Sequence, residues 1–159
     1  MDATPLVDLA PALRLAGLAV VIALLPLAWV WLRARGGNTA SRIAVLTAVT
    51  MFLTFDLMVF GSFTRLTDSG LGCPDWPGCY GEASPIGAHE DIHAAQAAMP
   101  TGPVTFTKAW IEMVHRYLAM TVGVLILVMC VVSWVGRHSL PHSPWWPTVT
   151  LVWVVVQGL

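Results

Sequence analysis

Long hydrophobic stretches alternate with short polar segments along the chain. Leu15–Leu32 carries no charge, and Asp56 is the one charge within Ile43–Phe63. The third stretch, Ala109–Val135, begins with polar residues and is predominantly apolar from Tyr117 onward. A helix needs roughly 20 apolar residues to cross about 30 Å of hydrocarbon. The pattern therefore predicts three membrane-spanning helices, packed as an all-α integral membrane bundle.

A fourth hydrophobic stretch begins near Trp145 and is still apolar at Leu159, a run that is too short to cross a membrane. We therefore expect the sequence to be a truncated record or a gene fragment. The first stretch is preceded by Asp2 and Asp8 and has no basic n-region, and it is longer than the hydrophobic core of a signal peptide. It is therefore interpreted as a retained span.

Composition strengthens the membrane assignment. Of the 159 residues, 57% are hydrophobic and 11% are charged, and the mean hydropathy is +0.73. Soluble domains carry roughly 25% charged residues, and disordered chains combine low hydrophobicity with high charge, so both classes are excluded. The net charge of −1 provides no basic field for nucleic acid. Membrane lipid is the expected surrounding.

The basic residues of the short connections set the orientation. Arg33, Arg35 and Arg42 lie between the first two spans, and Arg137 follows the third. Such residues favour the cytoplasmic side. The segment 64–108, which is rich in acids, is then expected on the exterior face.

This exterior loop contains two cysteines. Cys73 and Cys79 are six residues apart, separated by turn formers that include Pro74, Pro77 and Gly78. Such a spacer can bring two Cα atoms within the roughly 4.4–6.8 Å that a disulfide requires. A structural disulfide is favoured; a redox-active disulfide near a reaction centre and a metal site remain alternatives. Cys130, in the third span, is interpreted as a small buried hydrophobe.

Two histidines occur later in the same loop. His89 and His93 have the i, i+4 spacing that places both on one face of a short helix, which Pro100 would end. A solvated face of an interfacial helix is favoured over a metal-binding pair, since no third ligand is obvious.

A charged cluster marks the start of the third span. Glu112 and His115 are three residues apart and share a helix face. A helix-borne neutral imidazole is a natural axial ligand for haem iron. Glu112 could orient a water, accept a proton or pair with Arg116, and Arg116 and Arg65 could bind a carboxylate such as a haem propionate. The alternative is that these charges only snorkel to the interface. Asp56, deeper in the second span, has no partner that the sequence identifies.

The loop and the charged cluster together resemble one known family. Gly61–Gly81, with Thr-Arg-Leu-Thr-Asp-Ser-Gly-Leu followed by Cys-Pro-Asp-Trp-Pro-Gly-Cys-Tyr-Gly, is similar to the first exterior loop of bacterial haem A synthases. Ile111–Leu118 resembles the helix that follows in that family, and Val155–Leu159 resembles the start of the next. The resemblance divides the chain into an extra N-terminal span with its cytoplasmic loop, 1–41, and a truncated N-terminal half of the family's membrane domain, 42–159.

The resemblance implies an eight-helix fold of two similar four-helix halves in the bacterial inner membrane. It implies an oxidoreductase that converts a methyl group of haem O, its substrate, to the formyl group of haem A, the cofactor of terminal oxidases. His115 matches the first axial iron ligand of the N-terminal half, and Glu112 matches the acidic residue implicated in the chemistry. Cys73 and Cys79 match the loop cysteine pair of members that have a disulfide.

The resemblance also implies a haem b cofactor, whose ligands are expected in a second half that this sequence lacks. We therefore expect the chain to be inactive alone. Expected protein partners are haem O synthase, oxidase assembly factors or further copies of the chain. Two other functions remain open: a membrane thiol-disulfide oxidoreductase that uses Cys73 and Cys79, and a non-catalytic membrane assembly subunit.

Overall fold

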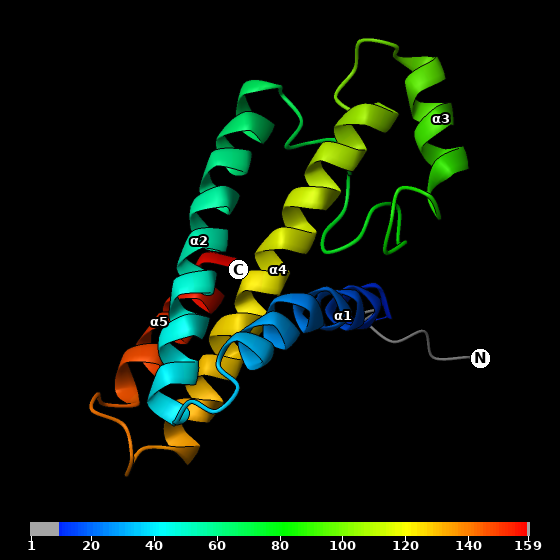
Figure 1. Ribbon diagram of the computed structural model, residues 1–159. Coiled ribbons are helices and arrows are strands. Elements are labelled where there is room, and N and C mark those ends of the chain that lie inside the picture. Colours follow the sequence, from blue (N-terminus) through cyan, green and yellow to red (C-terminus); the bar gives the residue numbers. More distant parts are fainter. Residues whose placement is uncertain (1–9, 159) are drawn as a thin grey trace, which may run out of the picture. The chain divides into compact units, whose positions relative to one another are not determined.

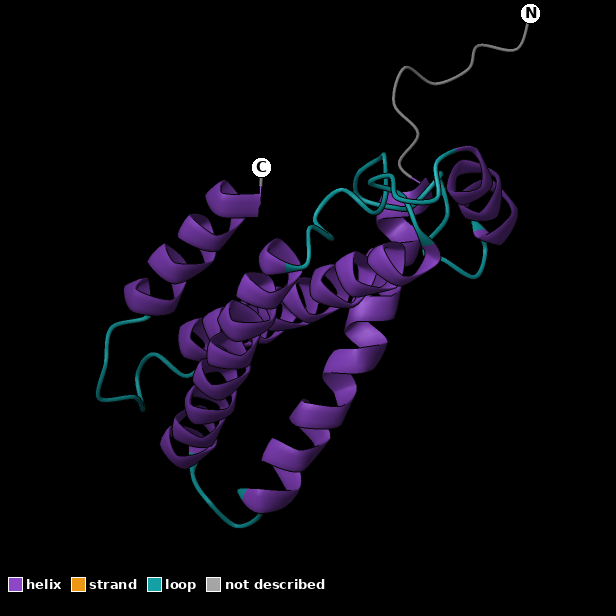
Figure 2. Cartoon of the chain, turned by 90° about the horizontal axis from the view of Figure 1, so that it is seen from above, coloured by secondary structure: helices purple, strands orange, loops and turns teal. Residues whose placement is uncertain are grey.

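The chain is helical throughout its regular structure. The computed structural model describes residues 10–158, so residues 1–9 and 159, including Asp2, Asp8 and the end of the fourth hydrophobic stretch, lie outside the description. Its elements are α1 (Ala10–Arg33), α2 (Thr39–Leu66), α3 (His89–Ala98), α4 (Phe106–Val135) and α5 (Trp145–Gly158) (Figure 1). No strand occurs between residues 10 and 158, where helices are joined by loops and turns (Figure 2). The all-α prediction is confirmed.

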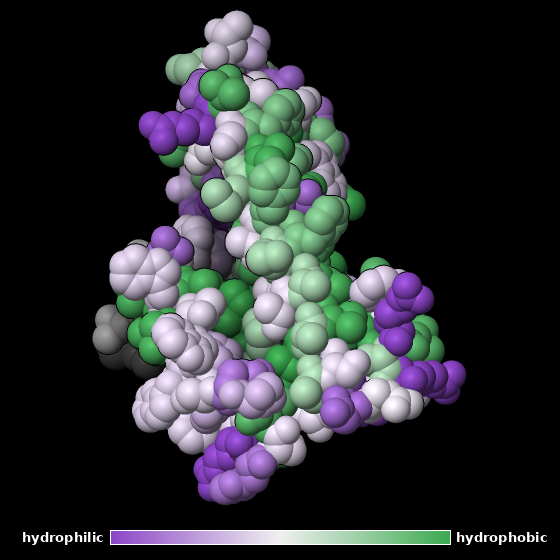
Figure 3. All heavy atoms as spheres, turned by 60° about the vertical axis from the view of Figure 1, so that its left-hand side comes forward, coloured by the Kyte–Doolittle hydropathy of each residue, from purple (hydrophilic) through white to green (hydrophobic). Residues whose placement is uncertain are grey.

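Three of the described helices are long and apolar enough to cross a membrane. They are Ala12–Arg33, Thr39–Leu66 and Phe106–Val135, the segments that the hydrophobic pattern predicts. Helix α5 has 14 residues and is not among them. Large apolar side chains are spread over the face seen in Figure 3, whereas strongly hydrophilic ones are few. A surface of this kind is suited to lipid.

Capping residues explain why two helices begin earlier than their hydrophobic stretches. The Asn38 side chain accepts a hydrogen bond from the backbone N–H of Ser41 at 2.9 Å, which starts α2 at Thr39. The hydroxyl of Thr105 accepts one from the N–H of Lys108 at 3.3 Å, at the start of α4. These polar turns satisfy backbone donors that have no partner inside a helix.

The helices contribute to two compact units. The first comprises residues 10–18 and 59–117, and the second comprises residues 19–58 and 118–158. In the second unit, Ala23 and Val30 of α1 pack with Leu46 of α2 and Leu125 of α4. The sequence-based division at residue 41 stays a prediction.

The second unit also holds α5. The Trp134 indole N–H donates to the Thr148 hydroxyl at 2.9 Å, and the Trp134 and Trp145 rings meet edge to face with centroids 5.4 Å apart. Cys130 is buried and its sulfur lies 3.4 Å from the same hydroxyl.

An apolar groove of about 850 Å³ between α1 and α2 has Arg33 as its one charged lining residue, so we assign no chemistry to it.

The first unit carries the candidate site. It combines the last turns of α2, the whole loop with α3, and the first turns of α4. The backbone of Gly72 lies directly against the start of α4, because a Cβ at this position would come within 2.5 Å of the carbonyl carbon of Lys108. Only a glycine permits this approach of loop to helix.

Candidate functional site

The first turns of α4 present the ionisable side chains of the site. His115 and Arg116 lie three and four residues after Glu112, which places all three on one side of the helix. Glu112 is buried, with 7% of its surface exposed. All three side chains line a cavity of about 380 Å³, a size within the range of ligand pockets.

The last turns of α2 and the residues just beyond them form the opposite wall of this cavity. Gly61, Thr64, Arg65 and Asp68 line it at positions i, i+3, i+4 and i+7. This spacing is that of a single helical face, although Asp68 itself lies two residues beyond the end of α2. The full lining is Gly61, Thr64, Arg65, Asp68, Gly70, Leu71, Glu112, His115 and Arg116. The cavity therefore lies between two helical faces that each carry charge.

His115 rests against the backbone of α2 at Gly61. A Cβ at Gly61 would lie 2.8 Å from His115 Nε2, so a larger residue at this position would displace the imidazole. The ring of Phe60 lies nearly parallel to the imidazole, with centroids 6.3 Å apart and an angle of 14° between the planes. Within residues 10–158, no hydrogen bond or ion pair engages the imidazole. No hydrogen bond or ion pair of these residues therefore competes with a ligand for the imidazole.

Glu112 is held on both of its oxygens. Oε2 accepts a hydrogen bond from the backbone N–H of Cys73 at 2.8 Å, and Oε1 is bound by the Arg116 guanidinium. The ion pair is largely shielded from solvent, with the two side chains 14% and 9% exposed. Of the roles that the sequence left open for Glu112, pairing with Arg116 is the one present in the structure.

Arg116 also fastens the cysteine loop. Its Nη1 donates to the carbonyl oxygens of Asp75 at 2.9 Å and Pro77 at 3.3 Å, and to that of Gly78. One planar guanidinium thus joins a carboxylate and three backbone carbonyls, which its fixed fork of donors makes possible. Turning Nη1 to a ligand carboxylate would break the contacts that hold this loop.

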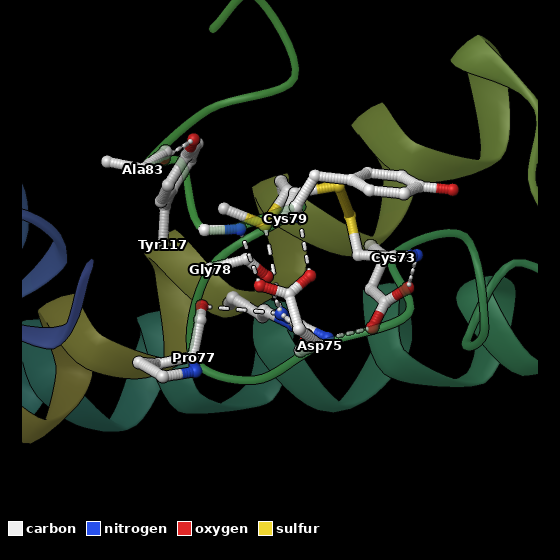
Figure 4. Close-up of a disulfide and its surroundings, with 12 residues drawn as sticks. Cys73, Asp75, Pro77, Gly78, Cys79, Ala83 and Tyr117 are labelled. Carbon is white, nitrogen blue, oxygen red and sulfur yellow. Dashed lines mark hydrogen bonds and ion pairs between the residues drawn. A yellow bond between two sulfur atoms is a disulfide. The ribbon is translucent and has the colours of Figure 1, made fainter. Parts of the chain in front are cut away.

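The loop itself is closed by a disulfide. Cys73 and Cys79 are joined, with Cα atoms 4.9 Å apart (Figure 4). Inside the turn, the Asp75 carboxylate accepts the N–H groups of Tyr80 at 2.5 Å and Gly81 at 2.8 Å. Both cysteines are buried, at 5% and 0% exposure. Thiol-disulfide exchange requires access to a sulfur, so this burial favours a structural disulfide over a redox-active one.

Tyr117 makes a further contact between α4 and the loop. Its hydroxyl donates to the carbonyl oxygen of Ala83 at 2.6 Å (Figure 4). Neither this contact nor the role of Gly61 was anticipated from the sequence. The spacing of positions 61, 64, 65 and 68 was the available signal for the cavity wall.

The loop histidines lie on the exposed face that the sequence predicts. His89 and His93 of α3 are both exposed, with ring centroids 4.3 Å apart, and both contact the ring of Phe106. Among residues 10–158, no group of three or more His, Cys, Asp or Glu side chains is arranged to hold a metal ion. Asp56 is exposed on α2 in the second compact unit and is not part of the cavity.

The residues present suit one axial contact to a haem. The imidazole of His115 has no competing hydrogen bond within residues 10–158. Gly61 leaves room for the ring against α2, and both residues line the cavity. Neutral imidazole is the usual proximal ligand of haem iron. The donor set therefore fits the group on the side that this chain provides.

Comparisons with known proteins identify the family of the chain. The family model described as cytochrome oxidase assembly protein, COX15-CtaA, matches residues 44–159. The Heme A synthase of Shewanella oneidensis is 47% identical over 100 residues, which are 62% of this chain and 29% of that protein. The Heme A synthase of Exiguobacterium sibiricum is 34% identical over 118 residues, 72% of this chain and 34% of that protein.

A third relative, the Heme A synthase of Shouchella clausii, is 27% identical over 119 residues, 74% of this chain and 33% of that protein. The chain thus spans about a third of the length of these curated relatives. No solved structure matches. The resemblance to haem A synthases, drawn from the cysteine loop and the Glu112–Arg116 helix, is confirmed. The family model covers most of the chain, which therefore belongs to the cytochrome oxidase assembly protein family, COX15-CtaA.

Proposed function

We propose that this chain provides a haem site of a haem A synthase, in which a methyl group of haem O is oxidised to the formyl group of haem A. The observation that carries the proposal is the imidazole of His115, which has no hydrogen bond within residues 10–158 and faces a cavity lined by two helices. Membership of the family and the names of the relatives point to the same chemistry.

Each residue at the site has a proposed task. His115 would hold the haem through its imidazole, and Gly61 sets how close the ring lies to α2. When bound, the iron porphyrin supplies the oxidative chemistry, while the protein supplies position and local field. Glu112, fixed by the Cys73 N–H and by Arg116, holds a carboxylate at the cavity wall, where it handles protons near the reacting methyl. We assign no residue of this chain to haem b.

The disulfide has a structural task in this proposal. Cys73 carries the N–H that binds Glu112, so closing the loop at Cys73 and Cys79 keeps this donor in place beside the site. A thiol-disulfide oxidoreductase would need an accessible sulfur, and both cysteines are buried.

We further propose that the protein resides in the bacterial inner membrane with loop 64–108 on its exterior face. Arg33, Arg35 and Arg42 flank the α1–α2 connection, and Arg137 follows α4. Basic residues in short connections favour the cytoplasmic side, which leaves the acidic loop and the cavity outside. An oxidising compartment there would maintain the disulfide.

Haem titration of the purified chain in detergent tests the site. We expect a Soret shift that saturates, and loss of that shift in His115→Ala. The control is His138→Ala, because His138 is exposed in the second compact unit and is remote in sequence from the cavity residues. A second control, His89→Ala with His93→Ala, removes the exposed pair of α3. Equal haem binding by His115→Ala and the unsubstituted chain would remove His115 from the proposal.

A chimera tests the reaction. In it, the matching 100 residues of the Shewanella oneidensis Heme A synthase are replaced by those of this chain. In cells that make haem O, we expect haem A in extracts from the chimera and none in extracts from its His115→Ala variant. A colourless chimera, or haem A formed without His115, contradicts the proposal.

A further inference from the structure

Arg65 stands out among the charged residues of the cavity. It lies in the last turn of α2, it is exposed, and its guanidinium has no hydrogen bond or ion pair within residues 10–158. It shares its helical face with Gly61, four residues earlier, and Gly61 is the residue against which His115 rests. The unpaired Arg65 therefore lies on the same cavity wall as Gly61, against which the His115 imidazole packs.

The other charges of the cavity are already balanced. Glu112 is paired with Arg116. Asp68 is paired with Lys108, whose Nζ lies 3.1 Å from the Asp68 carboxylate. Of the four charged lining residues, Arg65 is the one without an ion-pair partner within residues 10–158. A negatively charged group of a ligand would supply that partner.

Arg116 is already engaged with the protein. Its Nη1 donates to the carbonyls of Asp75, Pro77 and Gly78, and its Nη2 donates to Glu112. Turning these donors to a ligand carboxylate would break contacts that hold the cysteine loop and would strip a buried carboxylate of its partner, which is costly. Of the two arginines on the cavity wall, Arg65 is the one whose guanidinium has no hydrogen bond or ion pair within residues 10–158.

We propose that Arg65 is the residue that binds the carboxylate of the ligand in this cavity, and so sets the direction in which a tetrapyrrole enters. The proposal rests on the proposed haem site. Four residues along a helix correspond to about 6 Å, so the anionic edge of the ligand lies one helical turn beyond the His115 contact, toward the loop. Arg65 is a specificity-determining residue here, since it touches the ligand and not the reacting atoms.

The experiment compares a ligand with free carboxylates and one whose carboxylates are esterified. Haem and its dimethyl ester, which lacks free carboxylates, are titrated in detergent into the full chain, Arg65→Ala, Arg65→Lys and Arg42→Ala. Arg42 is the matched control, because it is an exposed arginine at the other end of the same helix. Far-ultraviolet circular dichroism checks that each variant retains its helices.

We expect the unsubstituted chain and Arg42→Ala to bind haem roughly tenfold more tightly than the dimethyl ester, the order expected for hydrogen bonds to a charged group. Arg65→Ala should lose this preference by binding haem more weakly and the ester unchanged, and Arg65→Lys should retain part of it. A preference that survives in Arg65→Ala, or an equal loss for both ligands, overturns the assignment while leaving the haem site intact. If the unsubstituted chain binds neither ligand, the proposed function itself fails.

Discussion

Replacing Gly61 with alanine should change the position of the His115 imidazole without destabilising α2. The added Cβ would lie 2.8 Å from His115 Nε2, whereas ordinary van der Waals contact begins at 3.4 Å. The ring nitrogen must therefore retreat by about 0.6 Å, the difference between these distances. A shift of about 0.6 Å at the end of the ring is a smaller rotation than the departure of about 30° from a rotamer that costs of order 0.5–1.5 kcal/mol, so this range is an upper bound. We expect a rise of up to roughly tenfold in the Kd of haem.

The stability of the same variant should move the other way or not at all. Alanine is better than glycine inside a helix by roughly 0.5–1 kcal/mol, which offsets the displacement of the ring in the ligand-free chain. The assays are haem titration by Soret absorbance and thermal unfolding by circular dichroism, both in detergent. Gly17→Ala in α1 is the control, because no atom lies within 4 Å of its added Cβ. Haem binding by Gly61→Ala as tight as that of the unsubstituted chain would refute the contact between His115 and α2.

Two further predictions concern the cysteine loop. Arg116→Lys removes the planar guanidinium that joins Glu112 to the loop carbonyls, so we expect the unfolding free energy to fall by at least about 2 kcal/mol and hydrogen exchange at residues 73–83 to become faster. Exchange as slow as in the unsubstituted chain would contradict the anchoring role of Arg116. Alkylation of the folded chain without reductant should modify at most Cys130, and labelling of three cysteines would show that the disulfide is absent. The double variant Cys73→Ser, Cys79→Ser should lose about 2 kcal/mol of unfolding free energy, because the disulfide restricts the chain entropy of a short loop.

The membrane helices follow directly from the sequence, because their signal is local. Predominantly apolar stretches near 20 residues place α1, α2 and α4 with few alternatives. Their starts are harder to predict, since Asn38 and Thr105 extend α2 and α4 by polar turns that a hydrophobic criterion omits. Polar residues that cap a helix contribute nothing to hydropathy, so the error falls at the ends and not in the middle.

The site is only partly accessible to the same reasoning. Glu112 and His115 are found because ionisable residues beside a membrane span are unusual and their spacing fixes a common face. The partners of Arg116 could not be predicted, because three of them are backbone carbonyls, which every residue carries. The contact between Gly61 and His115 joins positions far apart in the chain, so no periodicity within either helix reveals it.

The loop contacts of α4 affect how mutants at this site are to be interpreted. Glu112, Arg116 and Tyr117 each bind the segment 73–83, and His115 lies among them. The proposed iron ligand and the residues that support the loop thus lie within less than two turns of one helix. A change in the haem spectrum after substituting Arg116 would therefore report a loosened loop as readily as a lost ligand contact. A substitution of Arg65, whose guanidinium has no hydrogen bond or ion pair within residues 10–158, avoids this ambiguity.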